Sequence, residues 1–223
     1  MGKKFLLAIT CLLICQFGQS QNDSSESEWA FGVNAGVTLS DISFNPSIPQ
    51  DMLQQYVGGA TARYISEKNF GIQVELNYSM RGWKQKEEEG AQPNKYTRSL
   101  SYLELPVMTH MYFNMGRRAR LVFNLGPQLS YKISEKTITK EIYVVENMPP
   151  YYGVGDDMDI QRPFDWGLIG GMGVEIRTGV GSFILDGRYY FGLSDIFSNH
   201  KSDYFQASSN RVINIKLTYL FRQ

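Results

Sequence analysis

Eight stretches of this chain alternate apolar and polar residues, and the gaps between them are alternately long and short. The third stretch shows the pattern most clearly, because Phe70, Ile72, Val74, Leu76 and Tyr78 are separated by polar residues or glycine. Strict alternation of this length predicts a β-strand with one apolar face and one polar face. An even number of such strands, joined by short turns on one side and long loops on the other, is typical of a transmembrane β-barrel.

The sequence therefore predicts an all-β fold, an eight-stranded antiparallel up-and-down transmembrane β-barrel. We expect its strands at about 29–40, 56–66, 69–83, 98–113, 120–134, 163–177, 182–193 and 208–221. Short turns follow the second, fourth and sixth strands, so both termini lie on the short-turn side, which is the periplasm in this class. Pro106 lies inside the fourth strand, where it removes a ladder hydrogen bond, and we expect a β-bulge there.

The first twenty residues have the features of a secretory signal peptide. Lys3 and Lys4 precede an apolar run over 5–15, and small residues follow up to Ser20. This pattern predicts cleavage after Ser20, which leaves a single barrel domain over 21–223. The apolar run is too short to span a bilayer as a helix, which argues against the alternative of a membrane anchor.

Both cysteines of the chain, Cys11 and Cys15, lie in this first segment. Neither has a good lipobox before it, which disfavours a lipoprotein signal. Without them the mature chain has no disulfide, thiol nucleophile or cysteine metal site. Loss of Lys3 and Lys4 leaves 20 Lys and Arg against 22 Asp and Glu, a net charge of −2. This balance argues against a nucleic-acid partner, which would require a basic patch or stripe.

The polar faces of the strands predict a filled lumen. They are rich in Gly, Ser and Asn, and their charged residues are balanced in sign: Arg63, Arg81, Lys132, Arg188 and Lys216 against Glu75, Glu104, Asp165, Glu175 and Asp186. Buried charges must be paired, so this balance predicts a self-neutralising network inside the barrel. Aromatic residues gather near the strand ends, as in the girdles at membrane interfaces. The apolar face should therefore meet lipid; a soluble barrel with an apolar lumen is the alternative.

Five short motifs occur in chain order over nearly all of the mature sequence: GIQVELNYSMRGW at 71–83, YLELP at 102–106, NLGP at 124–127, DWGLIGGMGVE at 165–175 and RYYFGLSD at 188–195. Together they resemble the PorT-like "porin family" of outer-membrane β-barrel proteins from Bacteroidota. The resemblance implies an eight-stranded barrel in the outer membrane, surrounded by outer-membrane lipid. It implies no particular activity.

One constellation suggests catalysis. His110 is expected to point into the lumen, where Glu104 or Asp186 and Ser79 or Ser130 could complete a hydrolase or acyltransferase site. A catalytic triad is recognised by geometry, and sequence spacing alone shows none here. An interior hydrogen-bonding role for His110 is therefore the favoured interpretation.

The longest gap, 135–162, is the strongest candidate for a binding loop. Its first part, 137–144, still has a β-like composition, which suggests a hairpin that extends beyond the membrane. The aromatic and apolar residues of the gap suggest a loop-binding surface formed by Tyr143, Met148, Tyr151 and Tyr152. Packing against a neighbouring loop is the alternative. The acidic residues at 156–159 lack the spacing of a calcium loop, so a solvated loop tip is favoured over a metal site. The chain has no motif for a cofactor or a zinc ion, and none is expected.

These observations favour a non-enzymatic outer-membrane barrel with a structural or binding role through its long extracellular loops. Eight strands leave a lumen that side chains just fill, so we expect no open channel. The expected partners are outer-membrane lipid and an extracellular ligand or envelope protein. The alternatives are a narrow porin-like channel, an accessory component of a secretion or gliding machinery, which the PorT-like resemblance suggests, and a lipid-modifying barrel enzyme.

Overall fold

The computed structural model describes residues 28–45, 50–85, 95–141, 162–195 and 207–221. These residues form β1 (Glu28–Asn45), β2 (Gln50–Asp51), β3 (Leu53–Glu67), β4 (Phe70–Gln85), β5 (Lys95–Asn114), β6 (Ala119–Glu141), β7 (Phe164–Arg177), β8 (Gly181–Gly192) and β9 (Ala207–Phe221). Within these ranges there is no helix of the length and apolar character needed to cross a membrane.

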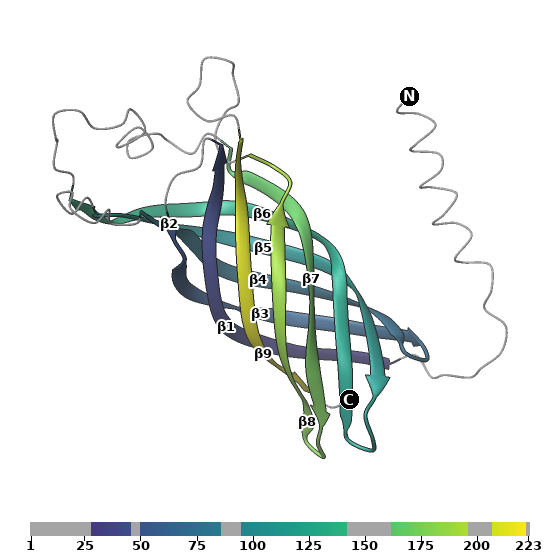
Figure 1. Cartoon of the computed structure of the whole chain (residues 1–223). Coiled ribbons are helices and arrows are strands. Elements are labelled where there is room, and N and C mark those ends of the chain that lie inside the picture. The colour runs from purple at the N-terminus through teal and green to yellow at the C-terminus, as the bar shows by residue number, and fades with distance from the viewer. Residues whose placement is uncertain (1–27, 46–49, 86–94, 142–161, 196–206, 222–223) are drawn as a thin grey trace, which may run out of the picture.

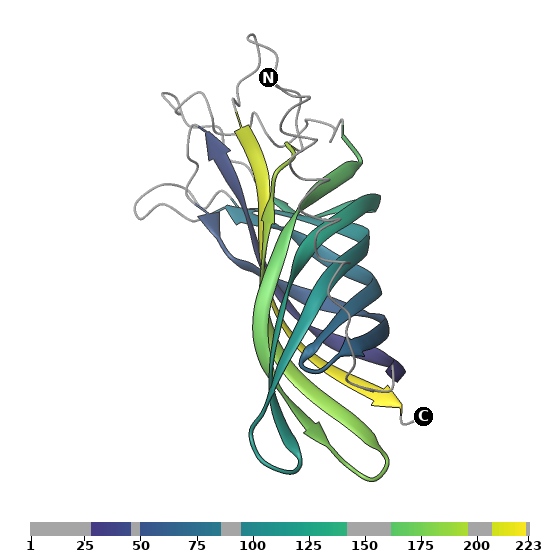
Figure 2. The same cartoon turned by 90° about the vertical axis from the view of Figure 1, so that its right-hand side faces the viewer.

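The strands form one closed antiparallel barrel, as the alternation predicts. Each long strand pairs with its neighbours along the chain, β1 pairs with β9, and the two-residue β2 pairs with the end of β4. The strands run obliquely around the barrel axis (Figures 1 and 2). The eight long strands confirm the all-β, eight-stranded fold. β1, β4, β6 and β8 finish at one end of the barrel, and the short turns after β3, β5 and β7 lie at the other (Figure 1).

The hairpin of β5 and β6 is longer than the apolar pattern indicates. The predicted strand 120–134 is observed as Ala119–Glu141, and its far end still pairs with β5, from Lys95 opposite Glu141. The extension is rich in Thr, Lys and Glu, so both of its faces are polar and the alternation that marks the other strands disappears. Backbone pairing continues regardless, since it does not depend on side-chain type.

The prediction of a β-bulge at Pro106 is wrong. Pro106 stays opposite Gln128, and the β5–β6 register is the same before and after it. The missing N–H is instead accommodated as a local gap in the β4–β5 ladder, between the pairs made by Glu104 and Val107, with no residue inserted. The irregularities of β5 and β6 lie nearer the long-loop end, at Thr97/Arg98 and Ser101/Tyr102.

The outer wall of the barrel is apolar. Burial alternates strictly along β8, where Ile184, Asp186, Arg188 and Tyr190 face inward. The outward positions of seven of the long strands carry large exposed apolar side chains, among them Val33, Leu76, Leu105, Leu125, Leu168, Leu185 and Leu217. Such a continuous apolar surface on a closed barrel suits lipid and not water. The apolar face is thus on the outside, and the soluble-barrel alternative does not describe this structure.

Aromatic side chains ring the short-turn end of this wall. Trp29 lies with its ring centroid 4.7 Å from that of Tyr64, and Phe183 lies 4.9 Å from Tyr219. A second set of exposed aromatic residues lies toward the long-loop end: Tyr56, Tyr78, Tyr131, Phe164, Trp166 and Phe191. Two such girdles are expected where the wall passes through the two membrane interfaces.

Candidate functional site

The lumen of the barrel contains most of the charged residues that the sequence places on the polar face. Each of these side chains belongs to a residue that is at most 3 % exposed. They project from inward positions of β3, β4, β5, β7, β8 and β9: Arg63, Glu75, Arg81, Glu104, Asp165, Glu175, Asp186, Arg188 and Lys216. They form two clusters, which we call the Glu75 cluster and the Arg81 cluster.

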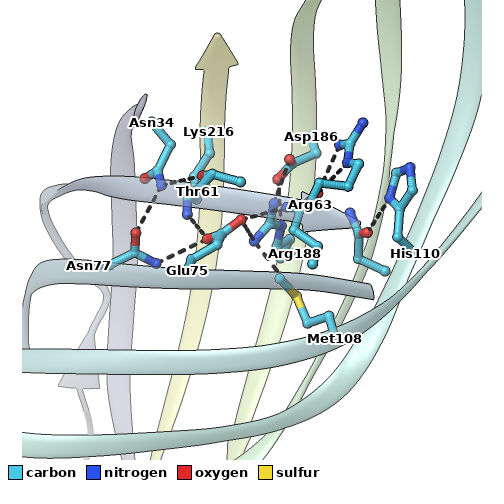
Figure 3. A network of polar contacts seen from close by, with 12 residues as sticks. Asn34, Thr61, Arg63, Glu75, Asn77, Met108, His110, Asp186, Arg188 and Lys216 are labelled. Carbon is cyan, nitrogen blue, oxygen red and sulfur yellow. Dashed lines mark hydrogen bonds and ion pairs between the residues drawn. The ribbon is translucent and has the colours of Figure 1, made fainter. Parts of the chain in front are cut away.

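Glu75 is the centre of the first cluster (Figure 3). Its carboxylate accepts hydrogen bonds from Arg188 Nη1 at 2.9 Å and Lys216 Nζ at 2.5 Å. Arg188 also pairs with Asp186, with Nε 2.7 Å from Oδ1. Asn77 donates to the second oxygen of Glu75 at 3.0 Å. Two cations therefore face two carboxylates, as desolvated charges require.

A glutamine joins a further ion pair to this cluster. Arg63 Nη1 lies 3.1 Å from Glu175 Oε2, while its Nε and Nη2 donate to Gln73 Oε1 at 3.0 and 2.8 Å. Gln73 in turn donates to Glu75 Oε1 at 2.6 Å. Three strands, β3, β4 and β7, are thereby cross-linked through side chains in addition to their backbone pairing.

Arg81 is the centre of the second cluster, nearer the long loops. Its guanidinium pairs with Glu104 at 2.6 Å and Asp165 at 2.9 Å, and donates to Ser130 Oγ at 2.7 Å. The same group lies between two aromatic rings, 4.5 Å from the centroid of Tyr102 and 4.8 Å from that of Tyr190. A guanidinium is well suited to this position, since it can donate in its plane and stack on its faces.

Two groups of apolar side chains lie in the lumen beside the clusters. Ile65, Tyr112, Val122, Ile184 and Leu220 form a short-turn apolar layer. Met108, Ile169, Tyr190 and Val212 form a middle apolar layer. The middle layer touches both clusters, because Met108 Sδ lies 3.7 Å from Arg188 Nη1 and Tyr190 stacks on Arg81. The lumen is thus filled by apolar layers and charged clusters.

His110 does not form the arrangement that catalysis would need. Its Nδ1 lies 2.8 Å from Asn124 Oδ1, so its ring contacts an amide and not a carboxylate. Of the residues that could have completed a triad, Glu104 and Ser130 bind Arg81, and Asp186 binds Arg188. Ser79 Oγ is buried and has no hydrogen-bond partner among the described residues. The side chain belongs to the packed lumen, beside the Glu75 cluster (Figure 3).

The structure places Lys132 at the long-loop rim and not in either cluster. Its Nζ lies 2.7 Å from Glu135 Oε2, and Arg98 Nη2 lies 3.1 Å from the other oxygen of the same carboxylate. β6 continues beyond the barrel wall here, which carries this inward position above the deep lumen. Burial raises the pKa of Glu135, but the hydrogen bond from Lys132 and the charge of Arg98 outweigh it and lower this pKa below its usual value.

Several candidate residues lie outside the described residues. They are Tyr143, Met148, Tyr151 and Tyr152 of the loop-binding surface, and the acidic residues at 156–159. Within the ranges that the structure does describe, no three His, Asp or Glu side chains are grouped so that they could hold a metal ion.

Sequence reasoning missed the neutral members of the lumen. Gln73 and Asn210 satisfy charged groups, and Tyr102 and Tyr190 enclose Arg81. All of them occupy inward positions of their strands, so the alternation contains the signal. Which charge each one contacts depends on the stagger between strands, which the sequence does not show.

The family model described as "Outer membrane protein beta-barrel domain" matches residues 17–198. The chain belongs to this family. The apolar wall, the two aromatic girdles and the filled lumen are therefore those of an outer-membrane β-barrel protein. A comparison with curated proteins found no match.

Solved outer-membrane barrels are similar in fold at low sequence identity. OprG from Pseudomonas aeruginosa is 12 % identical, with 88 % of this chain and 96 % of that chain covered and a TM-score of 0.47. Neisserial surface protein A is 12 % identical, with 85 % and 96 % covered and a TM-score of 0.44. Ail of Yersinia pestis, in complex with the heparin analogue sucrose octasulfate, is 13 % identical, with 87 % and 99 % covered and a TM-score of 0.41.

The Glu75 cluster predicts a large effect of removing one charge. Glu75→Gln keeps the shape of the side chain but leaves Arg188 and Lys216 with one carboxylate, Asp186, close by. We expect the free energy of unfolding to fall by about 3–5 kcal/mol, the usual cost of breaking a buried ion pair from one side. Urea unfolding of the barrel in phospholipid vesicles, followed by tryptophan fluorescence, measures this change.

Glu135→Gln is the matched control, because it removes the same charge from a partly exposed group at the rim. We expect a loss of at most about 1 kcal/mol for this variant. Equal losses in the two variants would contradict a special role of the Glu75 cluster.

Proposed function

We propose that this protein is a non-conducting, non-enzymatic outer-membrane barrel that acts as a scaffold for binding through its long connections. The observation that supports this proposal is the filling of the lumen by two charge clusters and two apolar layers. In this proposal the strands provide the stability of the barrel, and the connections after β1, β4, β6 and β8 bind the partner. The partner is then an extracellular ligand or another envelope protein.

The packing argues against the runner-up, a narrow porin-like channel. At the Arg81 cluster the guanidinium is fully buried and is enclosed by two rings and two carboxylates. A hydrated ion would have to break these pairs, and each broken pair leaves a desolvated charge behind. Eight strands also give a barrel whose interior is just wide enough for its own side chains.

The geometry of His110 argues against a lipid-modifying enzyme that uses it as a base. Its contact with Asn124 orients the ring without supplying the carboxylate that a triad places there. The candidate acids and Ser130 are occupied by arginines of the two clusters. His110 therefore fits a role in lumen packing.

The proposal also includes the orientation of the barrel in the membrane and its membership of a narrower protein family. Residues 1–20 serve as a signal peptide, both termini lie in the periplasm, and the long connections lie outside the cell. The loop-binding surface is formed by Tyr143, Met148, Tyr151 and Tyr152. The motifs at 71–83 and 165–175 support a PorT-like protein of Bacteroidota, for which an accessory role in secretion or gliding is a second candidate function.

The filled lumen predicts the absence of steady conductance. We expect the protein, reconstituted in planar lipid bilayers at low voltage, to show no persistent ion-sized current steps. The double variant Tyr102→Ala/Tyr190→Ala removes both rings around Arg81 and keeps every charge, and it should stay closed as well, because the Glu75 cluster and the short-turn apolar layer are unchanged. Stable openings of the native protein would contradict the scaffold proposal and favour the narrow channel.

The orientation predicts which positions are accessible from outside. The chain has no cysteine beyond Cys15, so Glu88→Cys, in the connection between β4 and β5, and Lys68→Cys, in the short turn after β3, each introduce one reactive thiol into the barrel domain. A membrane-impermeant maleimide added to intact cells should label the variant at position 88 and not the one at position 68. After the envelope is broken, both should react. Labelling of position 68 in intact cells would reverse the orientation.

A further inference from the structure

The short-turn end of the barrel contains a cavity of about 300 Å³ beside the short-turn apolar layer, and it reaches the Arg63–Glu175 ion pair. Its lining includes Arg117 from the turn after β5 and Thr178 from the turn after β7, which fix its position at this end. Ile65 and Leu220 of the short-turn apolar layer form an apolar part of its wall, and Phe221 adds an aromatic one. The cavity is thus separate from the Arg81 cluster and from the long connections.

Positive charge dominates this cavity. Four arginines line it, against two carboxylates: Arg63, Arg117, Arg120 and Arg177 against Glu28 and Glu175. Glu175 already pairs with Arg63 at 3.1 Å, so it neutralises little of the charge of the other three. A concave site with an excess of guanidinium groups attracts anions and concentrates their field.

Two of these guanidinium groups are held in place by contacts of their own. Arg120 stacks 4.2 Å above the ring of Tyr112, and its Nε donates to Asn114 Oδ1 at 3.2 Å. Arg177 donates through Nη2 to the Arg117 carbonyl at 3.4 Å. Such anchoring reduces the entropy that a ligand would lose by ordering these long side chains.

An unused donor lies in the same place. Arg177 Nε is buried, and among the described residues it has no hydrogen-bond partner. A buried N–H without a partner is costly, and an incoming acceptor would remove that cost. Guanidinium groups match the paired oxygens of a carboxylate or phosphate in both charge and geometry.

We propose that this cavity binds a small organic oxyanion, which has a carboxylate or phosphate on the arginines and a short apolar part on Ile65, Leu220 and Phe221. The volume is at the lower end of ligand sites in proteins, so it suits a single small molecule. The site adds a binding function at the end opposite the long connections. The cavity proposal does not depend on the role of the long connections or on the direction in which the barrel is inserted in the membrane.

Isothermal titration of the whole barrel in a non-ionic detergent tests the site with three probes. Phenyl phosphate and benzoate, which combine an oxyanion with a ring, are expected to bind saturably at one site and more weakly as NaCl rises. Inorganic phosphate should bind less tightly than phenyl phosphate, since it leaves the apolar wall uncovered. Failure of both ring-bearing anions to bind saturably would overturn the proposal.

Three variants separate this site from general attraction to a basic surface. Arg177→Gln should weaken phenyl phosphate binding about tenfold, the effect of losing a hydrogen bond to a charged group. Arg117→Gln, at an exposed turn position, should also weaken it without affecting folding. Arg118→Gln removes the same charge from the next residue, which does not line the cavity, and should leave affinity within about twofold.

The migration of unboiled samples on SDS gels checks that each variant is folded. Equal weakening in Arg117→Gln and Arg118→Gln, or no weakening in Arg117→Gln, would show that the cavity does not bind the anion.

Discussion

Charge pairing in the lumen is the interaction on which the rest of this barrel depends. Four cations lie deep in the lumen, and each has a carboxylate within 3.1 Å: Arg63, Arg81, Arg188 and Lys216. A closed barrel of eight strands leaves little room for the water that would otherwise solvate these groups. The protein can therefore fill its centre with charge only where opposite charges meet from different strands. Several of those contacts join strands that are not neighbours in the sheet, as Arg188 of β8 joins Glu75 of β4.

The alternation of the sequence was sufficient to predict the wall. Residues such as Leu76 and Leu185 lie outside because they alternate with residues that face the lumen, where the charged residues of the opposite face are buried. The bulge expected at Pro106 failed because the loss of one N–H could be absorbed by a gap in a single ladder. The end of β6 runs beyond the strand that the apolar period marks, and it agrees up to Glu141 with the hairpin extension that the β-like residues after Thr137 suggest.

The arrangement inside the lumen was beyond sequence reasoning for a physical reason. Pairing partners are set by the stagger of the strands around the barrel, so the contact of Arg63 with Glu175 bridges residues far apart in the chain. Lys132 shows the consequence, because it occupies an inward position yet lies above the clusters and pairs at the rim. The short-turn cavity was missed for the same reason, since the arginines that line it come from separate turns and strand ends.

A charge exchange at Arg63 and Glu175 tests the pairing account most directly. The free energy of unfolding in vesicles is to be measured for Arg63→Glu, for Glu175→Arg and for the double variant that exchanges the two charges. Each single variant places like charges together in the lumen and should destabilise the barrel strongly, whereas the double variant restores an opposite pair. The account predicts that the double variant is more stable than either single one, with a coupling of roughly 2 kcal/mol or more, within the range measured for contacting residues. Strictly additive losses would show that the barrel is held by its wall alone and that the paired charges of the lumen do not stabilise it.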